Sequence, residues 1–148
     1  MRILGVNAAG LKSKLQSFND ILNRLEPQVW SVQETKLRNN ETLKSEFLEK
    51  YQVYYLNRQL SGGGGLAVGI DKNIESALIR EGNDTTEVIV IQIILENMPV
   101  RLVVGYGPQE NALKERKDAF WDFLEEEAKQ ADSDNQGLII HAGSQCSK

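Results

Sequence analysis

The stretch that decides the fold is Val29–Thr35, which reads Val-Trp-Ser-Val-Gln-Glu-Thr. It is apolar or small at first and then delivers the carboxylate of Glu34. Such a run is typical of a buried strand with one polar residue at its end. Two further runs have this form: Arg2–Asn7, which ends on asparagine, and Val100–Pro108, which ends on Tyr-Gly-Pro. A fourth apolar run, Gly137–Ile140, passes into His-Ala-Gly-Ser without a carboxylate.

The composition is that of an ordinary globular protein. The 148 residues are 41% hydrophobic and 26% charged, which predicts one domain over residues 1–148. The apolar runs are too short to cross a bilayer, and no secretory signal is visible. A single cysteine, Cys146, suits a reducing compartment, so we expect the nucleus or cytoplasm and no membrane partner. The net charge of −4 gives no overall attraction to nucleic acid.

Hydrophobic periodicity predicts an α/β fold with a mixed, largely antiparallel sheet and flanking helices. Expected helices cover 12–25, 41–49 and 111–130. Expected strands cover 2–7, 28–34, 52–56, 66–70, 75–80, 87–96, 100–106 and 136–141, and turns at 61–65 and 97–99 separate some of them.

Four features suggest chemistry, and each has a plainer interpretation. The glycine-rich segment Ser61–Gly65 lacks the Lys-Ser/Thr ending of a phosphate loop and precedes a strand, which favours a turn. His141 is the only histidine, and no nucleophile motif accompanies it. Cys146 is read as an exposed thiol. Glu34 differs, because a carboxylate that ends so apolar a run needs an ion pair, hydrogen bonds or a metal.

Taken in order, these motifs resemble the endonuclease/exonuclease/phosphatase family, which includes exonuclease III and deoxyribonuclease I. The motif sequences are most similar to those in the endonuclease domains of non-LTR retrotransposons, and the resemblance covers about the first half to two-thirds of such a domain. The motifs that carry it are Ile3–Asn7 with Gly10-Leu11, Val32–Leu37, Gly63–Val68, Glu87–Ile91 and Val104–Glu110.

The resemblance implies phosphodiester hydrolysis with Mg²⁺ or Mn²⁺, with DNA as one partner and the choice between DNA and RNA left open. Glu34 would be the direct carboxylate ligand, and the amide of Asn7 would orient a metal-bound water or the scissile phosphate. Tyr106 would bond to the phosphate and stabilise developing charge. Glu87 would have a supporting role. The remaining candidates, Lys36 and Arg58, would contact backbone phosphates or be solvated surface cations.

The chain also departs from this family. The family presents an Asp-x-Asn pair where Gly137–Ile140 continues into His141, and it has a later Ser-Asp-His segment that finds no match here. The general-base role is not transferred to His141, because no carboxylate partner accompanies it. General acid–base catalysis contributes roughly 10²–10⁴-fold in rate, so we expect impaired activity. We also expect only weak metal binding, because one carboxylate and one amide make a weak site. The alternative is a non-catalytic interaction or self-assembling module that retains the half-fold.

The resemblance implies the N-terminal part of a two-sheet α/β sandwich. We expect the chain to supply mainly one sheet, with helices 12–25 and 111–130 on one face and the other face exposed. Large exposed apolar faces mark interaction surfaces, and two-fold dimers are the commonest closed assembly. The sequence therefore predicts a homodimer packed sheet against sheet.

Overall fold

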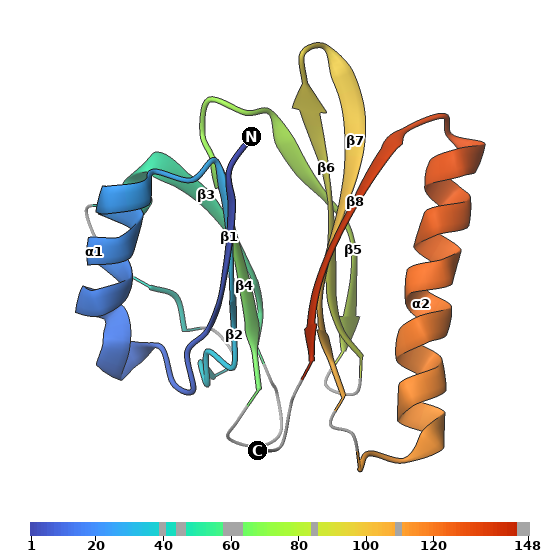
Figure 1. Cartoon of the computed structure of the whole chain (residues 1–148), viewed down its shortest axis with the longest axis horizontal. Coiled ribbons are helices and arrows are strands. Elements are labelled where there is room, and N and C mark those ends of the chain that lie inside the picture. Colours follow the sequence, from blue (N-terminus) through green and yellow to red (C-terminus); the bar gives the residue numbers. More distant parts are fainter. Residues whose placement is uncertain (39–40, 44–46, 58–63, 84–85, 109–110, 145–148) are drawn as a thin grey trace. The chain divides into compact units, whose positions relative to one another are not determined.

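The computed structural model describes residues 1–38, 41–43, 47–57, 64–83, 86–108 and 111–144. Contacts divide the chain into two compact units, which we call the N-terminal unit (Met1–Ile74) and the C-terminal unit (Glu75–Lys148). Each unit contains one four-stranded mixed sheet and one long helix (Figure 1). The expectation of one domain over residues 1–148 stays a prediction.

In the N-terminal unit the strand order is β1-β2-β4-β3. β1 and β2 are parallel, whereas β4 is antiparallel to both β2 and β3. The parallel pair aligns the carboxyl ends of β1 and β2 at one edge of the sheet. The elements are β1 (Ile3–Asn7), the 3-10 helix η1 (Lys12–Lys14), α1 (Leu15–Leu25), β2 (Val29–Gln33), the 3-10 helix η2 (Phe47–Lys50), β3 (Tyr51–Leu56) and β4 (Leu66–Asp71).

Trp30 is the centre of the core between α1 and this sheet. Its ring is fully buried and meets Phe18 of α1 edge to face, with ring centroids 5.0 Å apart. The opposing strand residue is Gly69, where an added Cβ would lie 2.1 Å from the indole. A glycine is therefore required at this position so that the tryptophan can lie flat against β4.

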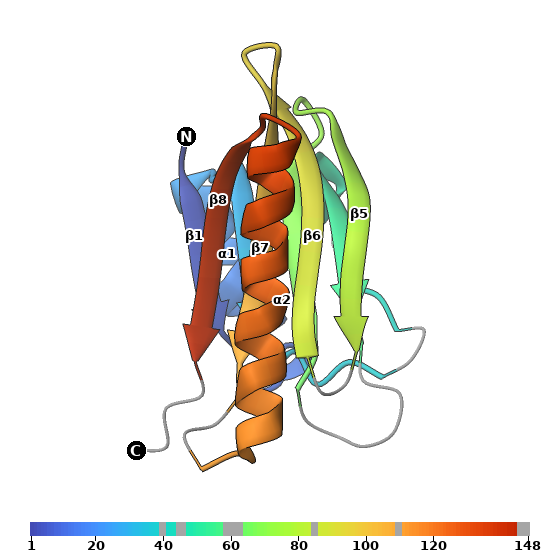
Figure 2. The same cartoon turned by 90° about the vertical axis from the view of Figure 1, so that its right-hand side faces the viewer.

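In the C-terminal unit the strand order is β5-β6-β7-β8. β6 and β7 form a hairpin whose two turn residues, Glu96 and Asn97, both have positive φ, as a type I′ turn requires. β7 and β8 are parallel and are joined through α2, which packs on the sheet over β6 and β7 (Figure 2). The elements are β5 (Ser76–Asn83), β6 (Thr86–Leu95), β7 (Met98–Gly107), α2 (Lys114–Ser133) and β8 (Gly137–Ser144).

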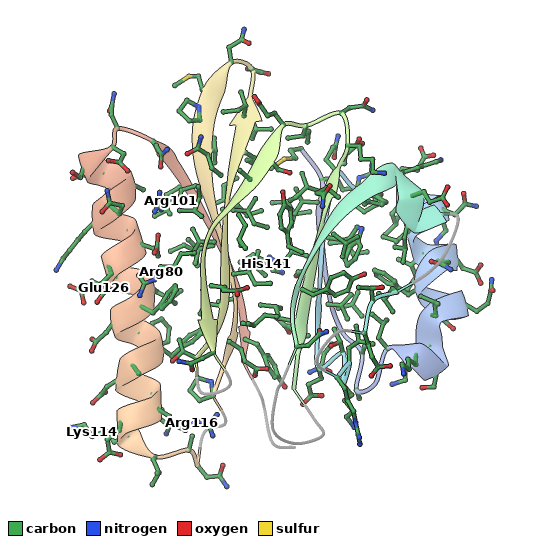
Figure 3. All side chains as sticks on the ribbon, turned by 180° about the vertical axis from the view of Figure 1, so that it is seen from behind. Arg80, Arg101, Lys114, Arg116, Glu126 and His141 are labelled. Carbon is green, nitrogen blue, oxygen red and sulfur yellow. The ribbon has the colours of Figure 1, made fainter. Side chains whose placement is uncertain are left out.

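Two kinds of contact hold α2 on its sheet. Phe120, Phe123 and Leu124 pack against valines of β6 and β7. Beside them, Glu127 accepts hydrogen bonds from Arg101 Nε at 2.7 Å and from Arg80 Nη1 at 3.0 Å. Figure 3 shows both arginines between the sheet and α2. The carboxylate of Glu127 is buried, and this ion-paired network compensates its desolvation.

The structure confirms the α/β class and every expected strand within a few residues. The short helix expected over 41–49 is wrong for residues 41–43, which form no helix; 44–46 lie outside the described residues. The described end of the segment, Phe47–Lys50, forms the 3-10 helix η2 and leads directly into β3.

Two expectations about the sheets are also wrong. The chain forms two sheets rather than mainly one, and α1 and α2 pack on different sheets. The homodimer packed sheet against sheet stays a prediction. In the described part of the chain, no helix has the length and apolarity needed to cross a membrane.

Candidate active site

Asn7 and Glu34 lie at the carboxyl ends of the neighbouring strands β1 and β2 of the N-terminal sheet. Asn7, the last residue of β1, aligns with Gln33, the last residue of β2, and Glu34 follows at once. The loops after both strands stay joined, because Ala8 N–H donates to the Gln33 carbonyl at 2.9 Å and Gly10 N–H to the Glu34 carbonyl at 2.8 Å. The two polar residues predicted from separate sequence motifs thus share one edge.

The backbone at this edge adopts an unusual conformation. Glu34 and Lys36 have φ angles of 54° and 55°, and Ala9 across from them has φ of 47°. A left-handed conformation in a residue other than glycine costs on the order of 1–3 kcal/mol and persists only where its surroundings enforce it. Such residues concentrate at functional sites, so the conformation of Glu34 marks this edge as a candidate site.

The end of the glycine-rich segment supports the Glu34 loop. Lys36 N–H donates to the Gly64 carbonyl at 2.8 Å, and Thr35 N–H donates to the Gly65 carbonyl at 3.3 Å. Gly65 has φ of 94°, and an added Cβ there would lie 2.4 Å from Thr35 Oγ1. Sequence reasoning read this segment as a turn and missed the support that it gives to the loop. Ser61–Gly63 lie outside the described residues.

Side chains fix the loop after β1 as well. Asn7 Oδ1 accepts a 3.2 Å hydrogen bond from Ala9 N–H, a local turn typical of asparagine. Lys14 Nζ donates to the Ala8 carbonyl at 2.6 Å. Asn7 is itself exposed and Glu34 half-buried, so both side chains are accessible at a preorganised edge. Lys36 is exposed on the same loop, whereas Arg58 lies outside the described residues.

Tyr106 and Glu87 form a second group in the C-terminal unit. They lie directly opposite each other on β7 and β6, and both are buried. On the other side of Tyr106, β8 aligns Gly143 with it. His141 lies opposite Val104, two residues earlier along β8. The pairing of Tyr106 with Glu87 is a signal that sequence reasoning missed, since it depends on the register of the hairpin.

A divalent cation would need oxygen ligands. Among the residues that the structure describes, no group of three or more His, Cys, Asp and Glu side chains could hold a metal. The Glu34 carboxylate and the Asn7 amide oxygen are hard donors of the right kind at one edge, and they fit a cation held by few protein ligands. The donor set is compatible with Mg²⁺ that keeps most of its waters.

No family model and no curated protein matches the sequence, whereas solved structures with similar folds include AP endonucleases and a 3′-5′ exonuclease. The AP endonuclease LMAP from Leishmania major matches with a TM-score of 0.77 and 19% identity over 95% of this chain. The APE2 catalytic domain from Xenopus laevis matches with a TM-score of 0.69 and 18% identity over 96% of this chain. The 3′-5′ exonuclease NExo from Neisseria meningitidis matches with a TM-score of 0.68 and 18% identity over 96% of this chain.

The chain has the endonuclease/exonuclease/phosphatase fold. It spans 54% of the length of LMAP and 57% of the APE2 and NExo chains, a little over half of each. Identities below one fifth establish the fold alone, so the expectation of this fold is confirmed. The roles of Asn7, Glu34, Tyr106, Glu87, Lys36 and Arg58 stay predictions.

Proposed function

We propose that this chain is a metal-dependent phosphodiester endonuclease-like domain that acts on DNA. The observation that carries the proposal is the placement of Asn7 and Glu34 at the ends of two neighbouring parallel strands, with Glu34 held in a left-handed backbone conformation. The AP endonuclease among the structural neighbours supports the same class, and another neighbour is a 3′ phosphatase bound to a product DNA hairpin. The amino-acid sequences of the motifs, which resemble those of non-LTR retrotransposon endonucleases, support a retroelement origin.

The chemistry is hydrolysis: a water oxygen bonds to phosphorus, the bridging P–O bond breaks, and the leaving oxygen takes up a proton. A bound Mg²⁺ or Mn²⁺ would supply Lewis acidity at the phosphoryl oxygen. Glu34 would hold the cation, and the amide of Asn7 would orient water or phosphate. Tyr106 would hydrogen-bond the phosphate, with Glu87 beside it, and Lys36 and Arg58 would contact neighbouring phosphates.

Activity is proposed to be weak. The 148 residues contain neither an Asp-x-Asn pair after β8 nor a Ser-Asp-His segment, the motifs to which the resemblance assigns water activation and protonation of the leaving group. Each general acid–base contributor is worth roughly 10²–10⁴-fold. Residual turnover would then depend on electrostatic stabilisation and positioning.

Plasmid nicking with Mg²⁺ or Mn²⁺ tests the proposal. We expect slow conversion of supercoiled DNA to nicked circles that EDTA stops. No nicking at high protein concentration would reject catalysis by this chain. A Mg²⁺ titration followed by NMR separates binding from turnover. We expect millimolar affinity at best, and micromolar binding that survives Glu34→Gln would contradict the assigned ligand.

The second candidate function is a non-catalytic interaction or self-assembling module. The observation that favours it is β8, which among the described strands is hydrogen-bonded to β7 alone and is distant from the Glu34 loop in the sequence. Association without turnover would distinguish this function from catalysis.

A further inference from the structure

The peptide group between Ala8 and Ala9 is held at both ends by side chains. Its carbonyl oxygen, on Ala8, accepts a 2.6 Å hydrogen bond from Lys14 Nζ. Its N–H, on Ala9, donates to Asn7 Oδ1 at 3.2 Å. Because a peptide group is planar and rigid, fixing the direction of the carbonyl also fixes the direction of the N–H. The side chains of Lys14 and Asn7 are therefore coupled through one rigid group.

The neighbouring peptide groups are held by the backbone. Ala8 N–H donates to the Gln33 carbonyl at 2.9 Å, and Gly10 N–H donates to the Glu34 carbonyl at 2.8 Å. These bonds continue the pairing of β1 with β2 beyond the ends of the strands. The residue between them, Ala9, has φ of 47°, a conformation that is uncommon for a residue other than glycine. The peptide group on which this conformation depends is the one that the two side chains orient.

The 3-10 helix η1 provides a fixed base for Lys14. Leu11, which precedes η1, is buried, and its N–H donates to the Thr35 carbonyl at 2.9 Å. Lys14 N–H in turn donates to the Leu11 carbonyl at 3.0 Å. The backbone of the lysine is thereby tied to the core and to the loop after β2. Its ammonium group polarises the carbonyl of Ala8, which makes the N–H of the same peptide group a better donor.

We propose that Lys14 is a positioning residue of the candidate active site. Lys14 orients the peptide group between Ala8 and Ala9, and this group orients the Asn7 side chain at the carboxyl ends of β1 and β2, where Glu34 also lies. Without the ammonium group, the peptide can rotate and relieve the positive φ of Ala9, and Asn7 then loses this bond. The inference rests on the proposed function, in which the Asn7 amide orients water or phosphate. Lys14 acts through Asn7 rather than on the substrate.

NMR spectra of the metal-free protein give the first test. Lys14→Met removes the donor and keeps an unbranched side chain, so we expect clear shifts of the Asn7 side-chain amide signals and of the Ala9 backbone amide signal. Lys14→Arg can still donate to the carbonyl and should return these signals towards their wild-type positions, which would exclude misfolding as the cause. Unchanged signals in Lys14→Met would overturn the proposal.

Lys12→Met is the matched control. Lys12 belongs to the same 3-10 helix and pairs with the carboxylate of Glu41 rather than with the loop after β1. The substitution removes the same charge from the same helix, and it should move the signals of Asn7 and Ala9 much less than Lys14→Met does. Equal shifts in the two variants would contradict a specific role of Lys14.

A Mg²⁺ titration of the same variants separates positioning from charge. Like charges repel, so the loss of either lysine should by charge alone leave Mg²⁺ binding unchanged or strengthen it. Loss of positioning acts in the opposite direction. We expect Lys14→Met to bind Mg²⁺ about tenfold more weakly than the wild type, the low end of the loss when a group that orients a metal ligand is removed. Lys14→Met that binds Mg²⁺ as tightly as Lys12→Met would overturn the proposal.

Nicking kinetics complete the comparison. Lys14→Met should lower kcat by about tenfold and should change KM for DNA no more than Lys12→Met does, because an interaction that supports the transition state is lost. A change in KM alone would contradict positioning. A wild-type chain that neither nicks DNA nor binds Mg²⁺ would reject the proposed function, and the metal-free spectra would then decide by themselves whether Lys14 orients Asn7.

Discussion

The carbonyl oxygen of Glu34 accepts a 2.8 Å hydrogen bond from the backbone N–H of Gly10. This bond joins the loop after β1 to the loop after β2, beyond the last aligned pair of the two strands. It orients the Glu34 peptide while its φ of 54° turns the chain. The candidate ligand is thereby held by backbone geometry rather than by a flexible loop, which is the preorganisation that a metal or phosphate site requires.

Gly65→Ala should destabilise the protein by about 1–3 kcal/mol, because φ of 94° disfavours a side chain and the new Cβ would clash with Thr35 Oγ1. Urea denaturation followed by tryptophan fluorescence measures the change. The double variant Gly65→Ala/Thr35→Ala should recover part of the loss, since the clash is removed and the backbone strain remains. Strictly additive effects of the two substitutions would show that the close approach to Thr35 is not the cause.

Glu127→Ala should cost about 3–5 kcal/mol in the free energy of unfolding, because it removes the carboxylate 2.7 Å from the buried guanidinium of Arg101 and leaves only that of Asp134, 4.0 Å away. The matched control is Glu125→Ala on the same helix, where the exposed pair with Lys129 should contribute less than about 1 kcal/mol. Equal losses for the two variants in denaturation would contradict a structural role for the buried network.

Burial raises the pKa of Tyr51 to about 12, and the nearby carboxylates of Asp71 and Glu26 act in the same direction. The native state therefore keeps the phenol proton between pH 10 and 12, whereas the unfolded chain releases it. The stability contributed by Tyr51 is full below pH 10 and is lost as pH rises through about 12. The ultraviolet absorbance of tyrosinate should show this late step, and Tyr51→Phe should reduce its amplitude without removing it, because burial also raises the pKa of Tyr55. A native Tyr51 titrating near 10 would contradict its burial.

The sequence predicted the strands well because the runs that form them are apolar and end in polar residues. Val29–Gln33 is an example: its five residues are all buried, and three of them, Val29, Trp30 and Val32, are apolar. The placement of Asn7 and Glu34 at neighbouring strand ends agrees with what the resemblance implies, because the parallel strands β1 and β2 bring their carboxyl ends to one edge.

Long-range register was not predictable from the sequence. The division into two sheets depends on which strands pair, and the apolar runs of β4 and β6 are equally compatible with one sheet or two. The same holds for the support of Thr35 by Gly65, which requires β4 to begin beside the end of β2. The sequence did not predict the buried ion pair of Arg101 and Glu127 either, because the two residues are far apart in the sequence and neither belongs to a recognised motif.

The most direct measurement of the central claim is the Mg²⁺-dependent nicking rate of Glu34→Gln compared with Glu26→Gln. Glu26 has a φ of 45° and precedes β2, so it is a glutamate of similar backbone conformation at the opposite end of the same strand. The account predicts that Glu34→Gln lowers the EDTA-sensitive rate by at least about tenfold, since a metal ligand is lost, while Glu26→Gln leaves it unchanged. Equal rates for the two variants, with both folded, would contradict the assignment of Glu34 as the metal ligand.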